Sequence, residues 1–101
     1  MRIEKMQLTR RQMLVLSTID VLAPYAYGAN ICRRIRRDTK IEYSTGSIHY
    51  VFQSLAKKGL ITSKLSDPSP VKGGRRRRLF ALTDSGRDEL RHLLNLSIGD
   101  T

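Results

Sequence analysis

Residues 44–65 read STGSIHYVFQSLAKKGLITSKL, and within this stretch a helical hydrophobic pattern gives way to that of a strand. Ser44 is a favourable helix N-cap residue. The apolar residues after it recur at the spacing of one helix face, at Ile48, Val51, Phe52 and Leu55. Gly59 follows two lysines, which is typical of a helix end. The period then changes, and residues 60–65 are predicted to form a strand.

A turn and a second strand are predicted to follow. Residues 67–74 read DPSPVKGG, and this mixture of proline and glycine is typical of a turn. Residues 75–83 are predicted as the return strand, with Phe80 and Leu82 facing the same way. Because two strands joined by such a loop form a β-hairpin, we expect a hairpin directly after the helix.

The N-terminal part of the chain carries a helix signal of its own. Thr9 and Gln12 have the spacing of a capping box, in which each residue satisfies an unpaired backbone N–H of the other. The apolar run MLVLSTIDVLA follows, and Pro24 is expected to stop the helix. The sequence therefore predicts a first helix between Thr9 and Pro24.

A second helix is predicted over residues 28–38. Ile31 and Ile35 lie four residues apart on its inner face, and Ile41 after it is expected to anchor the following link in the core. Four arginines occupy the rest of this helix, at Arg33, Arg34, Arg36 and Arg37. They can be interpreted equally as contacts to flanking phosphates or as a solvated helix face.

The order of these elements predicts the fold class. A last helix spans residues 84–98 behind the capping residue Thr83. Helix, helix, helix, hairpin and helix indicate an α+β fold that is mostly α, namely a winged helix-turn-helix with a β-hairpin wing and a short C-terminal helix. We expect an N-terminal arm (1–8), a winged-helix DNA-binding domain (9–83) and a C-terminal dimerisation helix (84–101).

The charge of the chain points to a polyanionic partner. The 101 residues make one domain, with 40% hydrophobic residues, 19 Lys or Arg and 9 Asp or Glu, for a net charge of +10. A domain this basic attracts polyanions, of which nucleic acid is the commonest, and an anionic membrane surface is the weaker alternative. No segment approaches the length of a membrane span. We therefore expect double-stranded DNA as the partner, and no membrane.

The sequence gives no support for catalysis. Cys32 is the only cysteine, so neither an internal disulfide nor a cysteine metal site can form, and a small buried hydrophobe is the simplest reading. The two histidines, His49 and His92, lie far apart without clustered carboxylates. No nucleotide-binding or nucleophile motif is present. We expect no catalysis, no metal and no cofactor. A small-molecule effector stays open, but the sequence gives no support for one. We expect a cytoplasmic protein that joins the nucleoid when bound to DNA.

Two features of the sequence are typical of DNA contact. The start of the third helix carries small hydroxyl residues and a glycine that let its backbone approach phosphate, and Tyr50 and Gln53 lie on its solvent face. The run at Arg75–Arg78 is suited to phosphate forks and narrow minor grooves. Successive residues of a strand point to opposite faces, so no more than half of the run can reach one groove from one face. The third helix can instead carry a polar, solvated face without DNA contact. The arginine run can instead be a solvated loop or a localisation signal.

The sequence resembles the PadR-like family of winged-helix regulators from about Leu8 to Leu94. The stretches that carry the resemblance are residues 24–31, residues 46–61, and the arginine run with LTDSGR at residues 74–87. The resemblance implies a homodimer that binds a palindromic operator, usually as a repressor. It also implies DNA contacts at Ser44, Thr45, Ser47, His49, Tyr50, Lys72, Arg75 and Arg76.

Together these arguments predict two sets of site residues. The DNA-binding set is Ser44, Thr45, Gly46, Ser47, His49, Tyr50, Gln53, Lys57, Lys72, Arg75, Arg76 and Arg77. The dimerisation set is Leu14, Leu90, Leu93, Leu94 and Ile98. Two other functions stay open, namely a non-specific architectural nucleic-acid binder and a winged-helix module for protein interaction.

Overall fold

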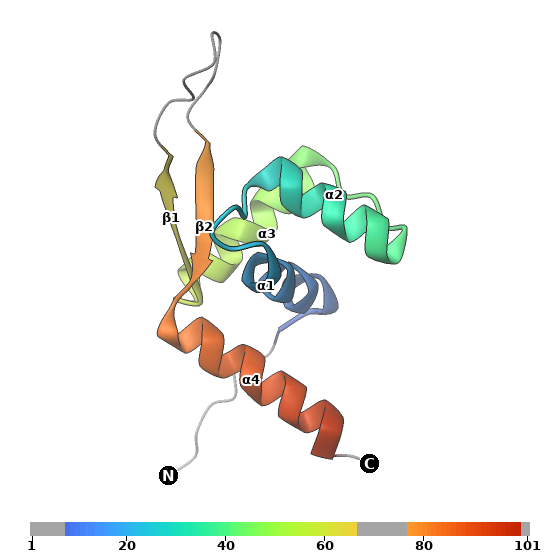
Figure 1. Cartoon of the computed structure of the whole chain (residues 1–101), viewed down its shortest axis with the longest axis vertical. Helices are drawn as coiled ribbons and strands as arrows, with labels where there is room; N and C mark the ends of the chain where they lie inside the picture. Colours follow the sequence, from blue (N-terminus) through green and yellow to red (C-terminus); the bar gives the residue numbers. More distant parts are fainter. Residues whose placement is uncertain (1–7, 67–76, 100–101) are drawn as a thin grey trace, which may run out of the picture.

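The computed structural model describes residues 8–66 and 77–99, with the side chains of the last helix described as far as Asn95. The elements are α1 (Arg10–Leu22), α2 (Gly28–Thr39), α3 (Thr45–Lys57), β1 (Ile61–Leu65), β2 (Arg78–Leu82) and α4 (Asp84–Gly99). In Figure 1, α1, α2 and α3 pack beside the strands β1 and β2, and α4 extends away below them. The predicted winged helix-turn-helix is therefore confirmed in its element order.

The predicted capping box at the start of α1 is confirmed. The Thr9 hydroxyl accepts a hydrogen bond from the Gln12 backbone N–H at 3.0 Å, and the Gln12 side-chain oxygen accepts one from the Thr9 N–H at 2.9 Å. The Gln12 amide nitrogen also donates to the Ser54 hydroxyl at 2.9 Å. One side chain therefore both starts α1 and ties it to α3.

The core lies where α1, α2 and α3 meet the hairpin. Its buried residues are Val15, Leu16, Ile19, Ala26, Ile31, Ile35, Ile48, Val51, Phe52, Leu55, Leu60, Ile61, Phe80 and Leu82. The rings of Phe52 on α3 and Phe80 on β2 lie with their centroids 4.1 Å apart. Full burial of one such ring stabilises the fold by about 1.5–3 kcal/mol. This contact fixes the position of α3 relative to the hairpin.

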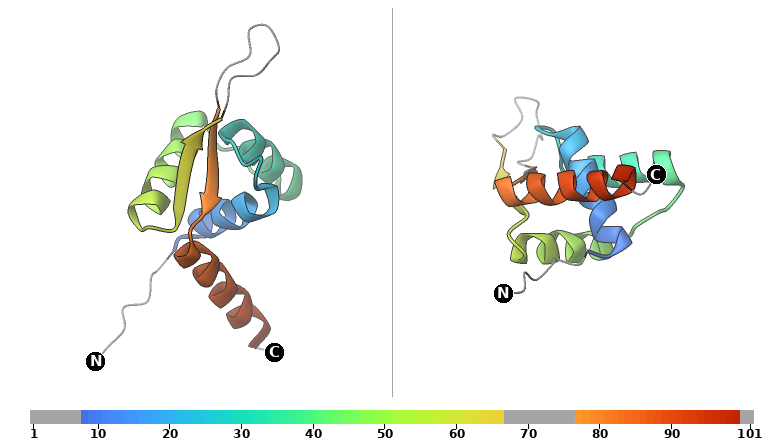
Figure 2. Two further views of the ribbon diagram at one scale, coloured as in Figure 1. Left: turned by 60° about the vertical axis from the view of Figure 1, so that its left-hand side comes forward. Right: turned by 90° about the horizontal axis from the view of Figure 1, so that it is seen from below.

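The hairpin is antiparallel, with Ile61 opposite Leu82 and Leu65 opposite Arg78. The return strand is shorter than the predicted residues 75–83, and residues 67–76 lie outside the described part of the chain. The segment before α2 adds a short third rung, because the Phe80 N–H donates to the Ala26 carbonyl at 2.8 Å. The strand β2 is therefore hydrogen-bonded to the segment before α2, and the left view of Figure 2 shows the hairpin beside the helices.

The start of α4 is locked onto the turn between α3 and β1. The Thr83 hydroxyl donates to the Gly59 carbonyl at 2.7 Å and accepts from the Gly86 N–H at 3.0 Å. Gly59 has a φ of 77°, a conformation that favours glycine. A Cβ added at Gly86 would overlap the Leu60 carbonyl oxygen. These two glycines let a turn and a helix approach each other closely.

The prediction for Ile41 is wrong. Its side chain is 39% exposed, whereas Tyr43 packs half-buried against the core. Lys40 ends α2 with a φ of 65°, in the left-handed region. The left-handed conformation at Lys40 turns the chain at the end of α2, and in the link after it Tyr43 packs against the core in place of Ile41.

Candidate nucleic-acid interface

The outer face of α3 is uncovered, as the sequence predicts. Ser44 caps the helix, and its hydroxyl accepts a hydrogen bond from the Ser47 N–H at 3.1 Å. Tyr50 is 71% exposed, and Gln53 and Lys57 are also exposed. The four apolar residues of the predicted stripe are all buried on the opposite side. A polar face on a rigidly packed helix is therefore available to a groove or a phosphate backbone.

The remaining predicted residues of α3 gather at its amino end. Thr45, Gly46 and His49 are exposed, and Ser47 is half-buried. The Ser47 hydroxyl accepts a hydrogen bond at 3.3 Å from the Arg11 guanidinium of α1. The predicted residues of α3 are thus exposed or half-buried, and Arg11 of α1 contacts the amino end of the helix.

Sequence reasoning missed Arg11. Its guanidinium lies 5.0 Å from the centroid of the Tyr43 ring, in a cation–π arrangement, as well as contacting Ser47. The capping box predicts that Arg11 sits in the first turn of α1. Nothing in the local pattern indicates that this turn meets the start of α3, which is 36 residues away.

The base of the hairpin holds the described part of the arginine run. The Arg77 guanidinium lies 4.3 Å from the centroid of the Tyr27 ring, and the Arg78 guanidinium donates to the Ser63 hydroxyl at 3.0 Å. Neighbouring arginines thus contact different segments, in agreement with the alternation of a strand. The predicted residues Lys72, Arg75 and Arg76 lie outside the described residues.

Arginines of α2 differ from Arg11 and Arg77 because they pair with nearby carboxylates. Arg34 and Arg37 both bind the Asp38 carboxylate, at 2.8 and 3.1 Å. Arg36 pairs with Glu42 at 3.2 Å. Hydrogen bonds from Arg34 and then Arg37 lower the pKa of Asp38 below its ordinary value of 3.8. The positive charge of this helix is therefore partly compensated within the helix and the link that follows it.

The described segments that form the candidate interface carry no acidic residues of their own. No Asp or Glu occurs between Glu42 and Asp67, so α3 and β1 carry no carboxylate. The first turn of α1 has none either. A phosphate backbone approaching α3 from outside therefore meets hydroxyl, amide and basic side chains of these elements without a like charge.

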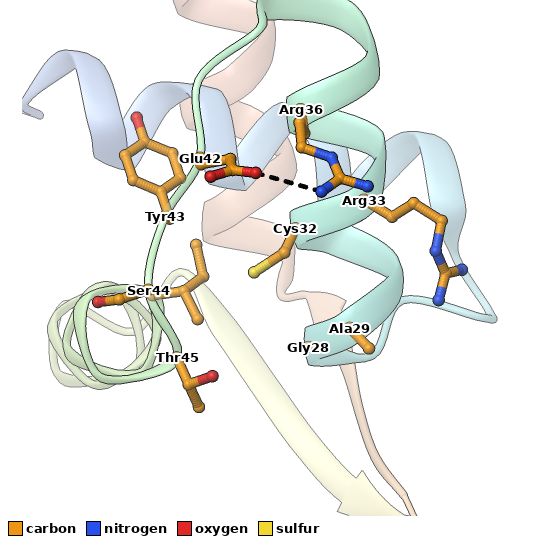
Figure 3. Close-up of a pocket in the computed structure, with 10 residues that line it drawn as sticks. Gly28, Ala29, Cys32, Arg33, Arg36, Glu42, Tyr43, Ser44 and Thr45 are labelled. Carbon is orange, nitrogen blue, oxygen red and sulfur yellow. Dashed lines mark hydrogen bonds and ion pairs between the residues drawn. The ribbon is translucent and has the colours of Figure 1, made fainter.

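A groove of about 670 Å³ lies between α2 and the start of α3, and Figure 3 shows its lining. The Arg36–Glu42 ion pair crosses it, and the Cys32 thiol points into it. Burial raises the pKa of the Cys32 thiol, which keeps it protonated and poorly nucleophilic at neutral pH. Among residues 8–66 and 77–99, no three His, Cys, Asp or Glu side chains are grouped as a metal site would require.

The predicted dimerisation residues lie at different depths. Leu14 and Leu90 are half-buried and pack against the core, Leu93 is half-buried, and Leu94 is 57% exposed. The side chain of Ile98 lies outside the described ones. None of the helices in the described part of the chain is long and apolar enough to cross a membrane.

Comparison with known proteins gives the following matches. The model of the transcriptional regulator PadR-like family matches residues 15–92. A PadR family transcription regulator from hypervirulent Clostridium difficile R20291 is 24% identical with a TM-score of 0.70, over 91% of this chain and 93% of that one. RosR from H. salinarum is 24% identical with a TM-score of 0.75, over 96% and 80%. A complex structure of hsRosR-S1 is 25% identical with a TM-score of 0.72, over 92% and 75%. No curated protein matches significantly.

Proposed function

The chain belongs to the PadR-like family of transcriptional regulators, and from this premise we propose that it represses transcription as a homodimer bound to a palindromic operator. One observation carries the proposal. The exposed face of α3 is free of carboxylates and is held beside the hairpin by the contact between Phe52 and Phe80. A helix and a hairpin in this relation can occupy neighbouring grooves of one duplex.

The face of α3 supplies sequence choice in this proposal. Tyr50 and Gln53 meet base edges, and Gln53 can pair with adenine through two hydrogen bonds. The amino end of the helix, with the hydroxyl and backbone groups of Ser44, Thr45, Gly46 and Ser47, together with His49, borders the phosphates. Lys57 contacts phosphate at the other end of the helix. Phosphate contacts fix the orientation of the helix, and base contacts select the sequence.

The hairpin supplies most of the affinity in this proposal. Lys72, Arg75, Arg76 and Arg77 contact phosphates or a narrow minor groove. Support comes from Arg77, whose stacking on Tyr27 ties the described end of the run to the start of α2. Each phosphate that is neutralised releases counterions, so binding weakens steeply as salt rises.

Residues 84–101 form the dimerisation element in this proposal, and residues 1–8 form an arm. The exposure of Leu94 and the extension of α4 away from the core in Figure 1 support this role. A two-fold dimer presents two identical DNA-binding surfaces, which is why its operator is expected to be palindromic. We also propose that the chain has no catalytic role and acts in the cytoplasm, on the nucleoid.

The test is a gel shift and footprint on the DNA upstream of the gene for this chain, with excess random duplex as competitor. One protected palindrome is the expected result. Gln53→Ala should lower the preference for that site over random DNA, whereas Asp20→Asn, a change at an exposed position of α1, should leave this preference unchanged. Equal affinity for all duplexes would favour the architectural function. No shift at low salt would favour the protein-interaction module.

A further inference from the structure

A second hollow, of about 480 Å³, lies between the start of α1 and the outer side of α3. Arg10 and Arg11 line it from α1, and Tyr43 and Tyr50 line it from the other side. Tyr50 is among the residues assigned above to base contacts. The hollow therefore opens beside the surface that α3 presents to DNA, and neither arginine belongs to the predicted DNA-binding set.

The geometry of Arg11 prepares it for an anion. A guanidinium has five N–H donors in a planar fork, and the Ser47 hydroxyl uses one of them at 3.3 Å. The Tyr43 ring lies against the group at 5.0 Å from its centroid and so restricts the orientation of its plane. The other N–H donors stay available for the two oxygens of a phosphate.

The charge around these arginines is not compensated locally. Within residues 8–66 and 77–99, no carboxylate forms an ion pair with Arg10 or Arg11. The first turn of α1 contains no acidic residue. Because both arginines line the hollow, a phosphate bound there lies near two positive charges that no ion pair compensates.

We propose that Arg10 and Arg11 bind one backbone phosphate of the DNA strand that passes α3, so that α1 extends the DNA contact beyond the helix-turn-helix and the wing. This inference rests on the proposed function, because it takes duplex DNA as the source of the phosphate. The site carries no base readout, so it strengthens binding to every sequence about equally.

The test measures the affinity of the full-length protein for a random 30-base-pair duplex between about 50 and 250 mM NaCl. Arg11→Gln should lower the slope of log affinity against log salt by about 0.9 for each bound protomer, since one phosphate contact is lost. Arg10→Gln should lower it in the same direction, and Arg11→Lys should retain most of it. Arg36→Gln, which removes one exposed charge that Glu42 already compensates on α2, should leave the slope unchanged.

The other outcomes each overturn the proposal. If Arg10→Gln and Arg11→Gln kept the salt slope of the unmodified protein while Arg75→Gln reduced it, the phosphate site on α1 would be disproved. The proposed DNA binding would stand. A normal slope with a lost preference for the operator would make Arg11 a positioning residue for α3. Thermal stabilisation by pyrophosphate that depends on Arg11, without a change in DNA binding, would assign the hollow to a free anion. No binding of the unmodified protein to duplex would overturn the proposed function as well.

Discussion

The arginines of α2 are chemically the same as Arg11 on α1 and Arg77 at the base of the hairpin, but their surroundings differ. On α2, Arg34 and Arg37 share the carboxylate of Asp38. On α1 and at the start of β2, Arg11 and Arg77 lie against tyrosine rings. A tyrosine ring holds a guanidinium in place without cancelling its charge, whereas a carboxylate does both.

This difference separates two uses of positive charge. An arginine with its own carboxylate must exchange that partner before it binds a phosphate, and the exchange returns little net attraction. An arginine held on an aromatic ring presents its full charge in a fixed orientation. The helix α4 follows the pattern of α2, because Arg87 pairs with Asp84 and Arg91 pairs with Asp88. We therefore expect the DNA-binding charges to lie on α1, α3 and the wing.

The largest expected effect comes from two matched double variants. Arg75→Gln with Arg76→Gln and Arg34→Gln with Arg37→Gln each remove two positive charges. The wing pair should lower the salt slope of random-duplex binding by about 1.8 per protomer, because two phosphate contacts are lost. The α2 pair should change it by less than about 0.5. Equal changes for both pairs, measured by fluorescence anisotropy across salt, would end the distinction between the two groups of arginines.

A single substitution should leave arginines of α2 without a carboxylate partner, as Arg11 and Arg77 are within the described part of the chain. Asp38→Asn leaves Arg34 and Arg37 without their shared carboxylate. If either arginine lies within reach of the backbone, the salt slope should rise by about 0.9 per protomer as one phosphate contact forms. Asp20→Asn, on the exposed side of α1, adds the same net charge and is the control. A rise of the same size in both variants would indicate a non-local effect of net charge.

Helix α3, to which we assign the base contacts, could be predicted almost completely from the sequence. Its cap, its buried stripe and its exposed face depend on the residues of 44–57 alone, since helix periodicity and capping act within a few positions. The capping box of Thr9 and Gln12 is local in the same way. These local signals predict α1, α3 and the candidate surface from the sequence alone.

The contacts of Arg11 and Arg77 with tyrosine rings could not be predicted from the sequence, because they form between distant segments. Arg11 reaches Ser47 and Tyr43 only after α1 and α3 have packed, and Arg77 reaches Tyr27 only after β2 lies beside the segment before α2. The prediction for Ile41 was wrong for a related reason. It made Ile41 the core anchor of the link after α2, but which residue of that link is buried depends on how the chain turns at Lys40, where the backbone is left-handed.

The support of Arg77 by Tyr27 can be tested with a pair of variants. Tyr27→Leu removes the ring under the guanidinium, and Tyr27→Phe retains it. We expect Tyr27→Leu to unfold with a free energy about 0.5–1 kcal/mol lower than Tyr27→Phe, which is the range for a partly exposed cation–π contact. Denaturant melts measure the difference. The salt slope of DNA binding should change little, because Arg77 keeps its charge. Equal stability of the two variants would mean that the ring contributes nothing to the wing base.

The smallest expected effect concerns acid. Hydrogen bonds from Arg34 and then Arg37 hold the pKa of Asp38 below 3.8, the ordinary value that the unfolded chain retains. A carboxyl whose pKa is lowered by folding stabilises the folded state above the unfolded pKa, and this contribution is lost as pH falls through the folded pKa. The melting temperature of the unmodified protein should therefore exceed that of Asp38→Asn by a constant amount between about pH 5 and 7. The difference should shrink below about pH 4 and also shrink at high salt, since the pair is exposed. A difference that grows as pH falls would mean that Asp38 is not the counter-charge of α2, and the contrast between the two groups of arginines would lose its physical basis.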